Sequence, residues 1–193
     1  MHLRMSGFMA TRASALLLSI LLSACGTPDA PPDAASTSTQ AEADPLIGYD
    51  LRRLRPREGE PLAVMFDRLH AETRAEGKRV VVLFSADWCE PCKHLDLELG
   101  NTHPRSMIGG VRILEIKEDD WSAAARMDEL NELRRRWEPV LNTYPLVVLL
   151  DDAGKRVEEM KEAKDRLEGQ GLDATLPIWF ASVTQSQAGH GTL

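Results

Sequence analysis

The residues with the clearest chemistry are two cysteines, Cys89 and Cys92, which lie three positions apart after a mostly β-branched apolar run at 80–84. If that run is a strand and a helix begins at the first cysteine, both sulfur atoms lie at one helix N-terminus. Free amide groups and the helix dipole there favour a negative sulfur, and a thiolate is the form that attacks disulfide bonds. We predict that Cys89 is the attacking thiol and that Cys92, covered by its own helix, resolves the mixed disulfide.

A Cys-x-x-Cys pair also serves haem attachment, zinc binding and structural disulfides. Covalent attachment of c-type haem needs a histidine directly after the second cysteine, and Lys93 occupies that position. A structural zinc site needs further ligands at paired spacing, which His70, His94 and His103 do not provide. A purely structural disulfide stays open as an alternative, although so short a loop constrains little chain entropy. We expect redox exchange, with no metal and no cofactor.

The sequence around the pair predicts alternating helices and strands that position it. Unbroken apolar runs and one turn signal predict strands, whereas apolar residues at helical spacing predict helices. The predicted strands are 80–84, 111–116, 146–150 and one near residue 157. The predicted helices are 62–77, 92–99, 121–137 and 172–183. This order indicates the α/β class.

The active-site signature of the thioredoxin family resembles one segment of this chain, Ala86-Asp87-Trp88-Cys89-Glu90-Pro91-Cys92-Lys93. The cis-proline segment of that family resembles a second one, Asn142-Thr143-Tyr144-Pro145-Leu146-Val147. The resemblance covers residues 62–183 and implies a thioredoxin fold, with a central mixed β-sheet of about four strands flanked by helices. It also implies that Trp88 shields the dithiol, that Pro145 is cis and faces the dithiol, and that the backbone beside Pro145 pairs with the substrate chain.

Some positions near the cysteines depart from the family pattern. The family often has a buried aspartate six residues before the first cysteine, as proton acceptor for the second thiol, and Leu83 stands at that position. Glu90, which precedes Pro91, is then the nearest candidate acceptor, with a solvated side chain as the alternative reading. A carboxylate at Glu90 opposes a thiolate on Cys89, whereas the cation of Lys93 favours it.

Two further departures concern the substrate side of the site. Tyr144 and Leu146 flank Pro145 at positions where small or β-branched residues are commoner, so we expect an altered substrate groove. The connection over 117–139 is longer than usual and contains two tryptophans. We expect it to pack as core or edge, with a docking surface as the alternative.

The N-terminus has the features of a secretory targeting segment. Arg4 and Arg12 precede an apolar run at 15–22, which is too short to span a bilayer as a helix. The run ends in Leu22-Ser23-Ala24-Cys25, which resembles the lipobox of bacterial lipoproteins. The resemblance implies cleavage after residue 24 and attachment to the lipid bilayer through acylated Cys25, and Gly26 favours the outer membrane of a Gram-negative bacterium. A plain secretory signal with a chance cysteine is the alternative.

The remaining segments complete the predicted domain organisation, after a signal peptide over 1–24. Residues 25–45 contain no large apolar side chain, so we expect the lipidated cysteine and a disordered tether. Residues 46–61 are a linker or an edge segment, residues 62–183 a thioredoxin-like domain and residues 184–193 a flexible tail.

These expectations combine into a functional hypothesis. The formal charge of -7 gives no basic footprint for nucleic acid. We predict a membrane-anchored thiol:disulfide oxidoreductase in the periplasm, a reductase that depends on a membrane electron donor. Its expected partners are protein disulfides of the envelope, with apocytochrome c among them, since a Glu-Pro dipeptide between the cysteines also occurs in reductases that serve cytochrome c maturation. The alternatives are a disulfide oxidase or isomerase, and a non-catalytic thioredoxin-like lipoprotein that binds a partner.

Overall fold

The computed structural model describes residues 43–138 and 143–188. The predicted signal peptide, Cys25, Gly26 and most of the predicted tether lie outside these residues, as do residues 139–142 and 189–193. Within the described ranges, no helix is long and apolar enough to cross a bilayer.

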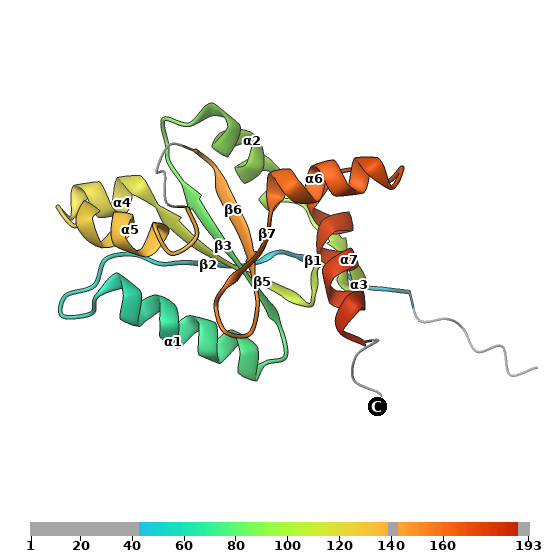
Figure 1. Cartoon of the computed structure of the whole chain (residues 1–193), viewed down its shortest axis with the longest axis horizontal. Helices are drawn as coiled ribbons and strands as arrows, with labels where there is room; N and C mark the ends of the chain where they lie inside the picture. The colour runs from blue at the N-terminus through green and yellow to red at the C-terminus, as the bar shows by residue number, and fades with distance from the viewer. Residues whose placement is uncertain (1–42, 139–142, 189–193) are drawn as a thin grey trace, which may run out of the picture. The chain divides into compact units, whose positions relative to one another are not determined.

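A mixed sheet of five strands lies at the centre of the domain, in the order β2-β5-β3-β6-β7 (Figure 1). Its strands along the chain are β2 (Asp50–Arg53), β3 (Arg79–Ser85), β5 (Val111–Lys117), β6 (Leu146–Leu150) and β7 (Arg156–Glu159). Strands β2, β5 and β3 are parallel, whereas β6 and β7 each pair antiparallel with their neighbours. The central strand β3 is buried at six of its seven residues, which agrees with the unbroken apolar run in its sequence.

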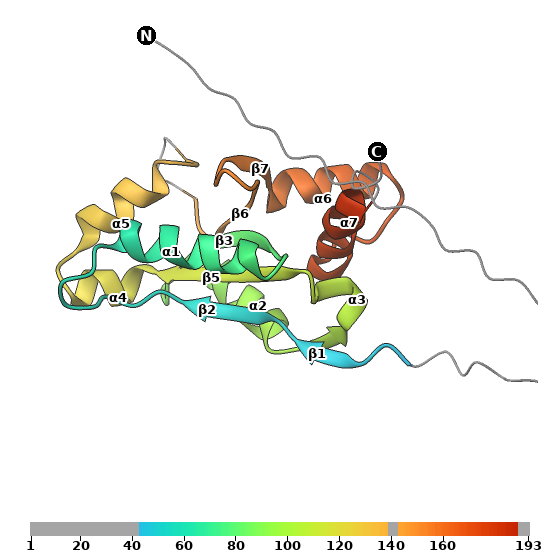
Figure 2. The same cartoon turned by 90° about the horizontal axis from the view of Figure 1, so that it is seen from below.

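The fifth strand, β2, comes from the segment that the sequence left open between a linker and an edge. Three of its four residues are exposed, so it carries no apolar pattern, and it pairs with β5 at the edge of the sheet (Figure 2). Just before it, β1 (Leu46–Gly48) pairs antiparallel with β4 (Thr102–Pro104) in a separate two-stranded sheet. The folded domain therefore begins well before residue 62.

The last residues of the predicted tether are also held by the domain. The carboxylate of Asp44 accepts hydrogen bonds from the backbone amide of Ser106 at 3.2 and 3.3 Å. The carbonyl of Pro45 accepts one from the amide of Arg105 at 2.9 Å. The prediction of a tether that extends to residue 45 is thus wrong at its end, because these two residues bond to the start of α3 (Arg105–Ile108).

Helices cover both faces of the sheet (Figure 1). One face carries α1 (Leu62–Ala75), α4 (Glu118–Ala123) and α5 (Met127–Arg134). The opposite face carries α2 (Glu90–Leu99), α3, α6 (Met160–Gly169) and α7 (Leu176–Ala188). Each face encloses its own apolar core, so β3 is covered on both sides.

The predicted helix over 121–137 is two helices. Helix α4 ends at Ala123, and Ala125 adopts a φ of 54° before α5 begins at Met127. A positive φ at alanine turns the chain out of the helical path. Trp121 and Trp137 are both buried, which agrees with core packing of this connection.

The C-terminal part contains a helix that the sequence pattern did not predict. Helix α6 has only two buried residues, Ala163 and Leu167, so its apolar stripe is too thin to give a periodic signal. The last helix begins at Leu176 instead of residue 172 and continues to Ala188. The prediction of a flexible tail from residue 184 is therefore wrong over its first five residues.

Candidate active site

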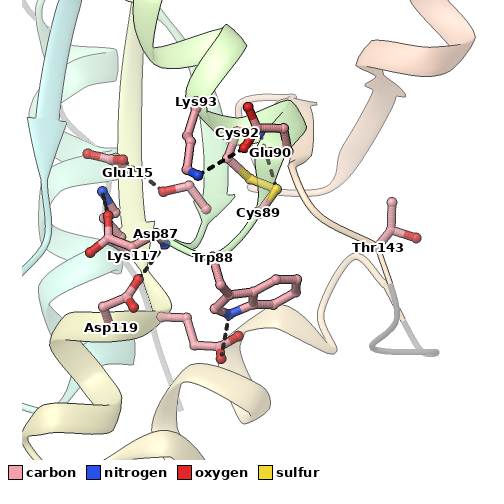
Figure 3. Close-up of a disulfide and its surroundings, with 12 residues drawn as sticks. Asp87, Trp88, Cys89, Glu90, Cys92, Lys93, Glu115, Lys117, Asp119 and Thr143 are labelled. Carbon is pink, nitrogen blue, oxygen red and sulfur yellow. Dashed lines mark hydrogen bonds and ion pairs between the residues drawn. A yellow bond between two sulfur atoms is a disulfide. The ribbon is translucent and has the colours of Figure 1, made fainter.

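The two cysteines lie at the junction of β3 and α2, where the sequence placed them. Cys89 is the N-cap of α2, and its Sγ accepts a hydrogen bond from the Cys92 backbone amide at 3.2 Å. Pro91 lies in the first helical turn, where a missing amide proton costs nothing. The two sulfur atoms are joined in a disulfide, with the Cα atoms 5.2 Å apart (Figure 3). The sulfur of Cys89 thus lies where a helix terminus stabilises negative charge.

Both cysteines are buried in this oxidised form. Cys89 is 3% exposed and Cys92 is 1% exposed, and they form an apolar cluster with Ala86. The side chain of Tyr144 packs against this cluster. The difference in access that the sequence led us to expect, with Cys89 outside and Cys92 inside, is therefore small in the oxidised state.

Tyr144 belongs to the segment that resembles the cis-proline segment, and the Tyr144–Pro145 peptide bond is cis. Its ring contacts the ring of Trp88 edge to face, with centroids 5.4 Å apart. Trp88 is 64% exposed, and its indole nitrogen donates a hydrogen bond to Glu118 at 3.3 Å (Figure 3). The resemblance assigned the shielding of the dithiol to Trp88, and the structure adds Tyr144, a partly buried side chain that packs against the cysteine cluster.

The position of the Tyr144 ring is set by contacts on two sides. The guanidinium carbon of Arg134 lies 4.1 Å from the ring centroid, within the range of a cation–π contact. Arg134 is itself buried, pairs with Glu138 at 2.6 Å and donates to the carbonyl of Thr143. Burial, together with a hydrogen bond between the Tyr144 hydroxyl and Glu118, raises the pKa of Tyr144 far above its ordinary value. The ring is thus a neutral, fixed group beside the disulfide.

Glu90 and Lys93 form an ion pair at 2.9 Å on the exposed first turn of α2. The hydrogen bond from Lys93 lowers the pKa of Glu90, so the carboxylate is charged at neutral pH. The sequence suggested that Glu90 disfavours and Lys93 favours a thiolate on Cys89. Because the two side chains form one ion pair, their opposing effects on the thiolate largely cancel.

The loop before Cys89 is tied to the neighbouring strand and helix. The backbone amide of Asp87 donates to Asp119 at 2.7 Å, and the Asp87 carboxylate pairs with Lys117 (Figure 3). The hydrogen bond from Lys117 lowers the pKa of Asp87, and the same bond raises the pKa of Lys117. These contacts fix the loop that carries the nucleophile.

The structure also brings two polar residues to the site that sequence reasoning missed. The hydroxyl of Ser85 donates to the carboxyl of Glu115 at 2.8 Å, and both residues are buried. The only signal in the sequence is a single acidic residue inside the apolar run at 111–116. Within the described residues, no group of three or more histidine, cysteine, aspartate or glutamate side chains is placed to hold a metal ion.

The thioredoxin family profile matches residues 63–168. A search of curated proteins found no match. Among solved structures, a disulphide isomerase from Xylella fastidiosa Temecula1 is 21% identical, with 68% of this chain and 97% of that chain covered and a TM-score of 0.46. A wild-type thioredoxin h from poplar is 23% identical, with 63% and 92% covered and a TM-score of 0.36. A thiol:disulfide interchange protein from Bacteroides sp. is 18% identical, with 62% and 82% covered and a TM-score of 0.35.

The matched residues span more than half of the chain and include both cysteines and Pro145. The chain therefore belongs to the thioredoxin family of thiol:disulfide oxidoreductases.

Proposed function

We propose that this protein reduces protein disulfides in the bacterial periplasm while anchored to a membrane through acylated Cys25. The Cys89 thiolate attacks a substrate disulfide and forms a mixed disulfide, and one substrate sulfur leaves. The Cys92 thiolate then attacks Cys89 Sγ, which releases the second substrate sulfur and leaves the Cys89–Cys92 disulfide. The observation that supports this exchange chemistry most strongly is the Sγ of Cys89 at the N-terminus of α2, 3.2 Å from an amide donor.

The surroundings of Cys89 support the reducing direction. Its sulfur accepts the Cys92 amide, but the neighbouring side chains of Ala86 and Tyr144 are apolar, which disfavours a charged sulfur. The cation of Lys93 is engaged by Glu90 and therefore adds little net positive charge. A weakly stabilised thiolate shifts the equilibrium toward the disulfide, so the dithiol is a good electron donor.

The reduction potential of the dithiol tests this direction. The Cys25→Ser variant of the chain leaves Cys89 and Cys92 as its only thiols and can be equilibrated with dithiothreitol buffers. We expect a potential near that of thioredoxin, about -270 mV. A value near the about -120 mV of the DsbA oxidant would contradict the reductase and favour the disulfide oxidase.

The proposed anchor rests on the sequence features of residues 1–26, and the proposed electron supply rests on the compartment to which they would direct the chain. The periplasm is kept oxidising, so turnover needs a membrane donor that reduces Cys89–Cys92 again. Metabolic labelling of cells with radioactive palmitate tests the anchor. We expect label on the wild-type chain and none on Cys25→Ser, which should also move to the soluble periplasmic fraction. Equal labelling of the two chains would contradict acylation at Cys25.

A further inference from the structure

A buried acidic side chain lies beside the strand position where the family often has its aspartate. Leu83 of β3 is the register partner of Glu115 of β5 in the parallel ladder. Adjacent strands lie about 4.8 Å apart and register partners in a parallel pair point to the same face. Leu83 belongs to the core that α2 covers through Leu95 and Leu99. The side chain of Glu115 therefore points to the face of the sheet that carries α2.

The carboxyl group of Glu115 is held by a hydroxyl group. Glu115 is 5% exposed and Ser85 is 1% exposed, and the Ser85 Oγ donates to Glu115 Oε1 at 2.8 Å. Within residues 43–138 and 143–188, no cation lies at ion-pair distance from this carboxyl group. Burying a carboxyl group without a cation costs free energy. Ion pairing therefore does not account for a glutamate at this position.

The hydroxyl–carboxyl pair lies at the end of β3 from which the cysteine loop leaves. Ser85 is the last residue of β3, and the next residue, Ala86, packs with Cys89 and Cys92. A hydroxyl group can accept one proton while it donates another. The hydrogen bond between Ser85 and Glu115 thus lies one residue along the chain from the side chain that packs on both cysteines.

The charged groups around Glu115 are engaged by other partners. Arg53 of β2 interacts electrostatically with Glu115, but its guanidinium binds Asp120 at 2.8 and 2.9 Å. Lys117, two residues along the same face of β5, pairs with Asp87 and interacts with Asp96 of α2. The Glu115 carboxyl group, in contrast, is hydrogen-bonded to the neutral hydroxyl of Ser85.

We propose that Glu115 is the internal proton acceptor for the Cys92 thiol and that the Ser85 hydroxyl relays the proton. The inference rests on the proposed function and concerns its resolving step. Cys92 gives its proton to Ser85 Oγ as Ser85 gives its own to Glu115, and the new thiolate attacks Cys89 Sγ. The bond between Cys89 and the substrate sulfur breaks, and that sulfur leaves as a thiolate. Water protonates the substrate thiolate, and Glu115 returns its proton to solvent.

The resolving step can be observed with 5,5′-dithiobis(2-nitrobenzoate) and the reduced chain in the Cys25→Ser background. Attack by Cys89 releases a first thionitrobenzoate at a rate that depends on reagent concentration. Attack by Cys92 releases the second thionitrobenzoate at a rate that does not depend on reagent concentration. We expect Glu115→Gln to slow the second release by about tenfold or more at pH 7, since positioned proton transfer contributes at least that much. The difference between the second-release rates of the variant and the wild type should become smaller toward pH 9.5, because hydroxide then removes the thiol proton.

Two further variants separate proton transfer from a structural role. Ser85→Ala should slow the second release with the same pH dependence, and the double variant should be no slower than Glu115→Gln alone. If Glu115→Gln does not fold, Ser85→Ala carries the same test. Asp165→Asn is the matched control, because it removes an exposed carboxylate of α6 that is paired with Lys161, and it should keep the wild-type pH profile.

Two results would overturn the inference. One is an unchanged second release in Glu115→Gln, and the other is a reduction by the same factor at every pH. Both leave the proposed function intact if the wild-type chain releases the second thionitrobenzoate. A wild-type chain that releases none would contradict the proposed function itself.

Discussion

The guanidinium carbon of Arg134 lies 4.1 Å from the centroid of the Tyr144 ring, and that ring packs against the Cys89–Cys92 disulfide. A buried cation at the end of α5 thus positions the side chain that covers the reactive bond. Since α5 belongs to the connection over 117–139, this connection contributes to the site as well as to the core.

Tyr144→Ala should expose the disulfide to attack. An aromatic contact contributes about 1 kcal/mol, so we expect reduction by dithiothreitol to be about fivefold faster than in the wild type. Tyr144→Phe keeps the ring and loses only the hydroxyl bond to Glu118, so it should stay close to the wild type. Rates measured by stopped-flow tryptophan fluorescence check this. Identical rates for Tyr144→Ala and the wild type would show that the ring does not limit access.

Arg134→Ala should destabilise the domain strongly. It leaves the carboxylate of Glu138, which is only 13% exposed, without its partner at 2.6 Å. Removing one member of a buried ion pair costs about 3–5 kcal/mol in the free energy of unfolding. The matched control is Arg136→Ala, whose pair with Asp67 is exposed and contributes about 0–1 kcal/mol. Urea denaturation measures both variants, and equal losses would contradict a special role for Arg134.

Acid should weaken the attachment of α6 and α7 to β7. Arg166 donates to the carboxylate of Glu158 at 2.7 and 3.0 Å, and Trp179 donates to it at 2.9 Å. The hydrogen bond from Arg166 lowers the pKa of Glu158 in the folded state. The folded state then binds fewer protons than the unfolded state, so this contribution is complete above the ordinary glutamate pKa of about 4.3. This contribution to the free energy of unfolding is lost as the pH falls through the lowered pKa of Glu158 in the folded state.

Urea denaturation of the wild type and Glu158→Gln between pH 3 and pH 7 checks this prediction. The neutral variant should be less stable than the wild type at pH 7, and the two unfolding free energies should converge at the acid end. A constant difference across the range would show that the charge of Glu158 is not responsible.

The parts of the fold that sequence could predict are those with a strong apolar pattern. The runs that form β3, β5 and β6 and the stripe of α1 gave their positions to within a few residues. Strand β2 was not predicted, because three of its four residues are exposed and give no apolar pattern. Its position depends on pairing with β5, which is distant in sequence. The break at Ala125 was missed because alanine favours helix, and tertiary packing overrides that preference here.

In the candidate site too, the sequence predicted local features and missed contacts between distant residues. Cys89 and Cys92 are neighbours in sequence, so their spacing alone predicted the N-terminal position on α2. Glu115 and Ser85 are 30 positions apart and meet only through the register of β5 with β3. The contact of Arg134 with Tyr144 likewise depends on how α5 packs against the segment before β6.

The account depends most on exchange of a disulfide bond between Cys89 and a substrate protein, with Cys92 releasing it. Expression of the full chain as Cys92→Ala in bacterial cells, followed by acid quenching and non-reducing electrophoresis, tests this directly. We predict protein adducts that dithiothreitol reduces, and no adducts with Cys89→Ala, which keeps Cys92 but lacks the attacking thiol. A Cys92→Ala chain without adducts, or equal adducts on the two variants, would contradict disulfide exchange through Cys89.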